Sequence, residues 1–175
     1  MKLKIFSWNV RGRNEGDKHK IIKSMIWSYL ADLVRLQETK VQQMNDSLVK
    51  SLRVGRCLNW GVVEARGQAG SILVFWDNRV LELIEMELGA FSVSCRFRNC
   101  EDNFVWMFTG VYGRILVEER EDFWDELSAI RGLWNDPWCV GGDLIVVRFL
   151  EERKSCQRLL AFMRRFFTVH LGDVS

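Results

Sequence analysis

The sequence contains little proline, few histidines and no long apolar run. With 1 Pro and 13 Gly among 175 residues, it lacks the composition of a fibrous or disordered chain. The longest apolar stretches, such as 72–76, are far shorter than the roughly 20 residues that cross a membrane. The first residues also lack a hydrophobic region of signal-peptide length. We therefore expect one intracellular domain over residues 1–175, nuclear or cytoplasmic and without a membrane anchor.

Neither the cysteine count nor the net charge indicates what the chain binds. The 5 cysteines are odd in number and lack paired spacing, so they indicate neither a disulfide framework nor a zinc site. The net charge is +2, but it is unevenly distributed. Residues 1–56 carry 12 Lys/Arg against 5 Asp/Glu, residues 57–147 carry 7 against 15, and residues 148–175 carry 6 against 3. Both an ordinary solvated surface and a basic rim that meets phosphate agree with this distribution.

Apolar patterning divides the chain into helix-linked strands, a run of antiparallel strands, and helix-linked strands again. The expected strands are 2–10, 33–36, 60–64, 71–76, 80–86, 91–97, 104–112 and 138–142, and the expected helices are one after 17, one around 44–52, 118–134 and 151–169. The first strand is apolar on both faces, which predicts a central position, and the strands from 60 to 112 predict a β-meander. This order predicts a mixed α/β fold with two sheets face to face and helices outside. Its core should take most of the eight tryptophans.

Four polar residues occupy equivalent places at the ends of predicted strands. Asn9 ends the first strand, Glu38 follows the second, Tyr112 ends the last strand of the meander, and Asp143 follows 138–142. Ligands gather where strand ends meet loops, because side chains there leave the core but stand on rigid supports. Two carboxylates, an amide and a phenol suit Mg²⁺, which prefers oxygen ligands. Each residue taken singly is also a common turn or capping residue.

Four short segments carry a resemblance to a known family. In chain order they read SWNVRG from Ser7, LQETK from Leu36, GVYG from Gly110 and GGD from Gly141. In order and spacing they resemble the signature segments of the endonuclease/exonuclease/phosphatase superfamily, the deoxyribonuclease I-like proteins. Finer features are similar to the endonuclease domain of plant LINE-type retrotransposon polyproteins; they are EARG at 64–67, FSVSC at 91–95, FW at 123–124 and WCVGGD at 138–143. The resemblance runs from residue 1 to about residue 166.

The resemblance implies a four-layer α/β sandwich, with two mixed and mainly antiparallel sheets packed together. It also implies a Mg²⁺-dependent phosphodiesterase that nicks DNA, with Mn²⁺ as a substitute metal and no defined protein partner. Glu38 would bind the metal, and Asn9 would orient the metal-bound water or the phosphate. Tyr112 would contact the scissile phosphate, and Asp143 would align or deprotonate the attacking water.

Two departures from the family pattern predict a weak or inactive enzyme. Where the family has asparagine two residues after the aspartate, this chain has Ile145, which has no polar side-chain atom. A closing Ser-Asp-His segment is also absent before Ser175, and neither His19 nor His170 lies in such a segment. We therefore expect an incomplete domain that lacks its C-terminal strands, binds metal weakly, and self-associates through an uncovered sheet.

Three functional readings stay open at this point. The chain is an impaired endonuclease, a non-catalytic module that binds nucleic acid or protein, or a non-functional retroelement fragment.

Overall fold

A computed structural model of the chain describes residues 3–10, 17, 20–24, 28, 30–38, 60–67, 70–112 and 115–142. For 9, 10, 38 and 60–67 the description covers the backbone and not the side chains. The elements with full bounds are β1 (Ile5–Val10), β2 (Leu33–Glu38), β3 (Trp60–Gly67), β4 (Gly70–Asp77), β5 (Leu81–Leu88), β6 (Ser92–Asn99), β7 (Val105–Val111), α3 (Arg120–Leu133) and β8 (Trp138–Gly141). The helices predicted around 44–52 and over 151–169 lie outside the described residues.

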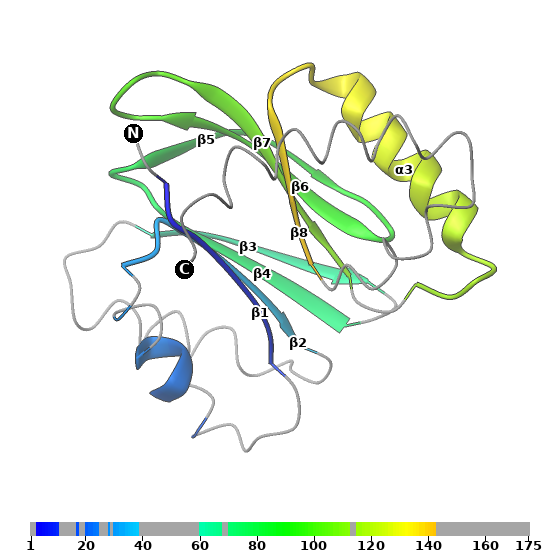
Figure 1. Cartoon of the computed structure of the whole chain (residues 1–175), viewed down its shortest axis with the longest axis horizontal. Helices are drawn as coiled ribbons and strands as arrows, with labels where there is room; N and C mark the ends of the chain where they lie inside the picture. Colours follow the sequence, from blue (N-terminus) through cyan, green and yellow to red (C-terminus); the bar gives the residue numbers. More distant parts are fainter. Residues whose placement is uncertain are drawn as a thin grey trace, which may run out of the picture.

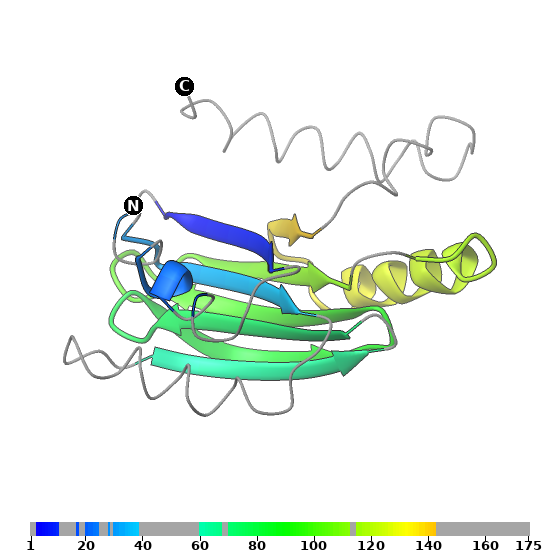
Figure 2. The same ribbon diagram turned by 90° about the horizontal axis from the view of Figure 1, so that it is seen from below.

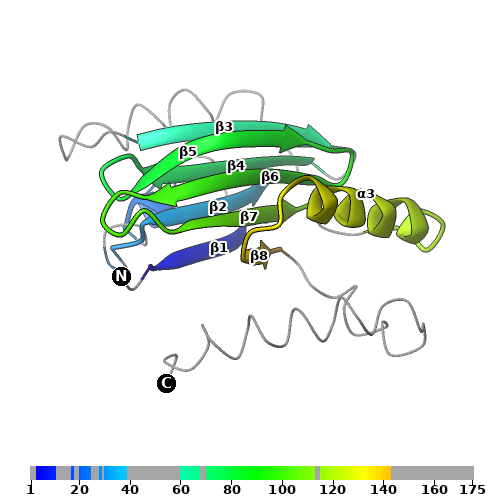
Figure 3. The same ribbon diagram turned by 90° about the horizontal axis from the view of Figure 1, so that it is seen from above.

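The described strands form two four-stranded sheets, in the orders β1-β2-β4-β3 and β5-β6-β7-β8. Each sheet contains one parallel pair, β1 with β2 and β7 with β8, and its other pairs are antiparallel. The sheets pack face to face with their strands in roughly the same direction (Figures 1 and 3). The predicted sandwich of two mixed, mainly antiparallel sheets is therefore confirmed.

Helices lie on the outer sides of the sandwich. In α3 the buried residues Phe123, Leu127 and Ile130 follow helical spacing and pack on Met107 and Trp138 of the second sheet. The helical residues 20–24, where Ile22 is 1% exposed, lie on the other side of the molecule (Figure 1). The acidic side chains in the first turn of α3 stabilise the helix, because the helix dipole makes its N-terminus positive.

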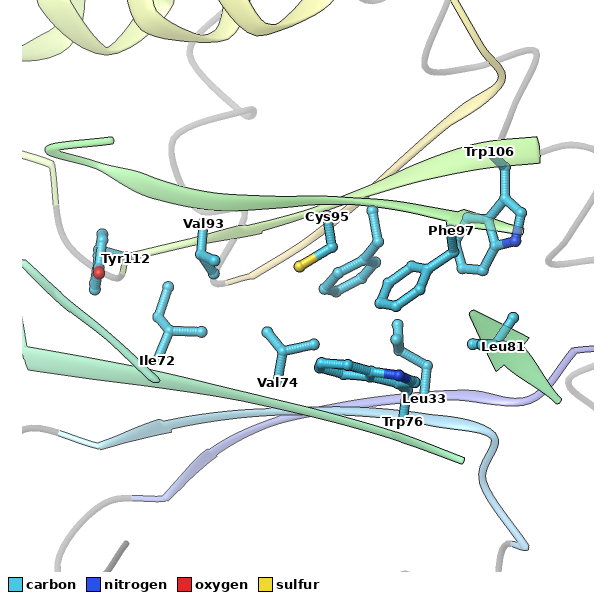
Figure 4. Packing of buried hydrophobic residues seen from close by; sticks show 11 residues of the cluster. Leu33, Ile72, Val74, Trp76, Leu81, Val93, Cys95, Phe97, Trp106 and Tyr112 are labelled. Carbon is cyan, nitrogen blue, oxygen red and sulfur yellow. The ribbon is translucent and has the colours of Figure 1, made fainter. Parts of the chain in front are cut away.

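The core between the sheets is apolar and partly aromatic, as Figure 4 shows. Trp76 of β4 meets Phe97 of β6 edge-on, with ring centroids 5.5 Å apart, and Phe97 lies 5.7 Å from Trp106 of β7. The buried Trp106 indole donates to Asn99 Oδ1 at 2.9 Å, so its polar atom has a partner. Among the tryptophans whose side chains are described, Trp76, Trp106, Trp134 and Trp138 are buried, and Trp8 and Trp124 are half-buried. The prediction that tryptophans mostly fill the core therefore holds for this part of the chain.

The predicted single meander is wrong, because the chain changes sheet between β4 and β5. Both edges of β4 are occupied, one by β2 and the other by β3, so β5 has no free edge beside β4. A tight turn carries the chain across instead, with Val80 N donating to Asp77 O at 2.9 Å. The buried side chain of Asp77 accepts a bond from Arg79 N at 2.9 Å. This turn divides the meander into a β3–β4 hairpin and a β5–β6–β7 meander.

The central position predicted for the first strand is also wrong within the part of the chain that the structure describes. There β1 lies at one edge of its sheet and β8 lies at one edge of the other. The two edges are on the same side of the sandwich (Figures 2 and 3). Ile5, Phe6 and Trp8 are each half-buried, so both faces of β1 contact protein, and this is why the pattern resembles that of a central strand. The predicted self-association concerns these edges and stays a prediction.

Candidate active site at the carboxyl ends of four strands

The carboxyl ends of β1, β2, β7 and β8 lie at one end of the sandwich. In the first sheet, the parallel pair β1–β2 ends with Val10 opposite Glu38. In the second, the parallel pair β7–β8 ends with Gly110 opposite Gly141. Parallel neighbours bring their carboxyl ends to the same edge, which is where ligands of α/β folds commonly bind.

Contacts between the sheets show that the two pairs end at the same place. The Arg35 guanidinium of β2 donates to the carbonyl oxygen of Val111, the last residue of β7. A Cβ built on Gly141 of β8 would lie 3.6 Å from Ser7 Oγ of β1. The four carboxyl ends therefore converge, two from each sheet.

The residues predicted from the sequence occupy this end to the extent that the structure describes them. Asn9 is the fifth residue of β1 and Glu38 is the last of β2, although their side chains are outside the described residues. Asp143 directly follows the described Gly142, and both Asp143 and Ile145 lie outside the described residues. The structure thus brings together the backbone positions of Asn9 and Glu38, the side chain of Tyr112, and the strand that leads to Asp143.

Tyr112 directly follows β7 and is buried at the site end of the interior. Its side chain is 2% exposed, and Figure 4 shows it at the same end of the core as Ile72 and Val93. The backbone N–H donates to Phe91 O at 2.8 Å, whereas the hydroxyl has no hydrogen-bond partner among the described residues. Burial, and then the negative charge of Glu126, raise the pKa of Tyr112 to about 12. The phenol holds its proton at neutral pH, as any tyrosine does, and so can donate a hydrogen bond.

The structure adds two polar side chains that the sequence analysis missed, Arg35 and Gln37. Both are 1% exposed, and because side chains alternate along a strand they lie on the same face of β2 as Leu33, which lies in the core between the sheets. Arg35 donates to Gln37 Oε1 as well as to Val111 O, and so joins the end of β2 to the end of β7. The Arg35 side chain packs beside Gly110 of β7, where a Cβ would lie 3.4 Å from Arg35 Cγ. In the sequence, the charged residue Arg35 stands inside the otherwise apolar run 33–36. That position could have indicated a buried guanidinium.

A metal site would depend on residues whose side chains the structure does not describe. Among the described side chains, no group of three His, Cys, Asp or Glu could hold a metal ion. The predicted oxygen donors are Glu38 and Asp143, with the Asn9 amide beside them. Carboxylate and amide oxygens are the donor types that Mg²⁺ prefers, so the chemistry of this set fits the ion.

No helix among the described residues is both long and apolar enough to cross a membrane.

Comparisons with known proteins place the fold in one structural class. No family model matches the chain, and no curated protein does. Among solved structures, an endonuclease/exonuclease/phosphatase family protein from Bacteroides thetaiotaomicron matches with a TM-score of 0.65 and 13% identity, over 82% of this chain and 63% of that one. D. rerio TDP2 complexed with a single-strand DNA product matches with 0.61 and 19%, over 81% and 60%. The human Nocturnin catalytic domain with bound sulfate matches with 0.60 and 16%, over 81% and 64%.

The chain therefore has the fold of the endonuclease/exonuclease/phosphatase proteins. It spans about three-fifths of the length of these structures. At 13–19% identity, these matches show the fold and not the activity.

Proposed function

We propose that this chain is an endonuclease/exonuclease/phosphatase domain of LINE-type retroelement origin that binds the phosphodiester backbone of DNA and hydrolyses it slowly. The observation that carries the proposal is the convergence of four strand ends, which joins the backbone positions of Asn9 and Glu38 to Tyr112. The retroelement origin is supported by the sequence segments alone. The match to a TDP2 structure that contains a DNA product favours a nucleic-acid substrate.

Each residue has a role that fits phosphodiester hydrolysis. Glu38 is the residue that would hold Mg²⁺ or Mn²⁺, and Asn9 would orient the metal-bound water or the phosphate. The bound ion would supply positive charge to the phosphoryl oxygens. Asp143 orients and deprotonates the attacking water, as a carboxylate within hydrogen-bond reach does. The protonated phenol of Tyr112 donates to a phosphate oxygen. Because this hydroxyl is buried, a phosphate oxygen reaches it only if the groups that cover it move aside.

Slow hydrolysis is expected because one contributor to the transition state is replaced. Ile145 stands where the resemblance places an asparagine, and loss of one transition-state hydrogen-bond donor lowers the rate about 10²–10³-fold. The same replacement favours the second candidate function, a module that binds nucleic acid without cleaving it. Binding and cleavage must therefore be measured separately.

The experiment combines DNA binding with plasmid nicking on the full chain. Binding of a fluorescent duplex is measured at several salt concentrations, and nicking is measured with Mg²⁺ and with a chelator. The variants are Glu38→Gln and Asp143→Asn. The matched control is Asp125→Asn, which removes a carboxylate from an exposed position on α3.

We expect binding with a steep negative salt slope, since phosphate contacts release counterions. We also expect slow Mg²⁺-dependent nicking that both site variants abolish and the control retains. Binding without nicking would support the second candidate. Nicking that survives Asp143→Asn would contradict the assignment of the site, and a chain that neither binds nor nicks would contradict both functions.

A further inference from the structure

One carboxylate of α3 is built into the turn between β5 and β6. Glu126 accepts hydrogen bonds from Ala90 N at 2.8 Å, from Phe91 N at 3.2 Å, and from Ser92 Oγ at 2.6 Å. A Cβ on Gly89 would lie 2.0 Å from Glu126 Oε1, so only glycine leaves space for the carboxylate there. Charge-assisted bonds of this kind are roughly twice as strong as neutral ones. The carboxylate therefore fixes the turn 89–92 against the helix.

The same turn holds the residue that follows β7. Phe91 O accepts the bond from Tyr112 N at 2.8 Å, and Ser92 lies opposite Val111 in the β6–β7 register. The Phe91 ring also packs edge-on against Phe123 of α3, with centroids 6.1 Å apart. Contacts thus run without a break from α3 through Phe91 to the backbone of Tyr112.

Charged groups act on this end of β7 from both packed layers. Glu126 approaches from α3, and its negative charge is the second cause, after burial, of the raised pKa of Tyr112. Arg35 approaches from β2 and donates to Val111 O, one residue before Tyr112. A carboxylate on the helix side and a guanidinium on the side of the first sheet therefore flank the phenol-bearing residue.

We propose that Glu126 is a positioning residue for Tyr112, which it presents to the candidate phosphate site by holding the turn 89–92. The proposal rests on the proposed function only for the role of Tyr112 toward phosphate. The hydrogen bonds and the ring contact carry the positioning itself.

The chain is well suited to a direct test, since Tyr29 and Tyr112 are its only tyrosines. In a Tyr29→Phe background, tyrosine labelled with ¹³C at Cζ gives one NMR signal, that of Tyr112. Glu126→Gln removes the charge and keeps a carbonyl acceptor, whereas Glu126→Ala removes both. Asp125→Asn is the matched control, because it removes the charge of the exposed neighbour. Tryptophan fluorescence of the same samples reports whether each variant is folded.

We expect both Glu126 variants to move the Cζ signal of Tyr112 at neutral pH, Glu126→Ala by more than Glu126→Gln. The control should leave the signal in place. If the Tyr112 signal is the same in the parent and in both Glu126 variants, Glu126 does not position Tyr112. A variant that loses its fold is replaced by Ser92→Ala, which removes the 2.6 Å bond only and should move the neutral-pH signal in the same direction by a smaller amount.

Adding inorganic phosphate and a short DNA duplex separates this inference from the proposed function. If the Cζ signal depends on Glu126 but does not respond to phosphate or DNA, the positioning stands and the proposed role of Tyr112 fails. If it responds to either ligand but not to the Glu126 variants, the proposed role stands and the positioning fails.

Discussion

The two ends of the sandwich interior contain different kinds of side chain. At one end Trp76, Phe97 and Trp106 pack edge to edge, and the indole of Trp106 has its hydrogen-bond partner in Asn99. At the other end the buried side chains include Arg35 and the phenol of Tyr112, whose hydroxyl has no partner among the described residues. Figure 4 shows the transition along the core, from Trp106 to Tyr112.

The difference indicates that the two ends of one core have different roles. Burial of large apolar rings is the main source of stability in a small domain. A buried guanidinium contributes less, because its desolvation offsets the hydrogen bonds that it forms. A buried hydroxyl without a described partner has no such bond to offset its desolvation. We therefore expect the aromatic end to carry stability and the polar end to carry the capacity for binding.

The largest effect is expected at the aromatic end. Phe97→Ala removes a fully buried ring between two tryptophans and should lower the free energy of unfolding by about 3–5 kcal/mol. Urea unfolding followed by tryptophan fluorescence measures the change. A loss below about 1 kcal/mol would show that the aromatic end does not dominate stability.

The second largest loss of stability is expected at alkaline pH, through Cys95 in the middle of the core. Burial raises the pKa of Cys95 to about 12 from an ordinary value of 9, so the folded state holds its proton where the unfolded state loses it. Stability from this thiol is full below pH 9 and falls by about 1.4 kcal/mol per pH unit up to 12.

Urea unfolding at pH 7 and pH 10.5 measures this loss in the parent and in Cys95→Val. The variant should lose less stability between the two pH values, by about 2 kcal/mol. Cys100→Ser, at an exposed thiol, is the control and should behave as the parent does. Equal losses in the parent and in Cys95→Val would contradict the prediction.

A smaller effect is expected near the polar end, at the turn that Glu126 holds. Gly89→Ala places a methyl group 2.0 Å from the carboxylate, so that the hydrogen bonds of Glu126 must shift. We expect a loss of about 0.5–1.5 kcal/mol, the net contribution of a typical hydrogen bond, because the end of the Glu126 side chain can move aside. Gly132→Ala is the matched control, since nothing lies within 4 Å of the added carbon. In a helix this change should be neutral or stabilising by up to about 1 kcal/mol. Equal effects of the two changes would contradict the packing of the turn.

The smallest effect is expected for Tyr112→Phe. The hydroxyl has no described hydrogen-bond partner, so its removal costs no bond and should change the unfolding free energy by less than about 1 kcal/mol. The same variant should weaken DNA binding if Tyr112 donates to phosphate. If Tyr112→Phe lost stability but kept its DNA binding, the assignment of stability to the aromatic end and of binding to the polar end would be wrong.

The resemblance in the sequence and the strand pattern together predicted most of the fold. Every described strand overlaps a predicted one, and α3 lies within the predicted 118–134, because alternating and helical apolar spacings reflect local geometry. The meander failed because the pairing of β4 with β2 is a contact between residues distant in the chain. For the site, the position of Tyr112 at the end of β7 was predicted, but its burial was not.

By itself, the sequence determined where strands and helix lie and which polar residues follow strand ends, since both depend on neighbours along the chain. Only the tertiary structure decided what surrounds those residues. It placed Arg35 between the sheets, brought Val111 to its guanidinium, and set Glu126 against the turn before β6. Contacts between distant segments depend on how the sheets and the helix pack, and no local pattern specifies which polar groups that packing will bury together.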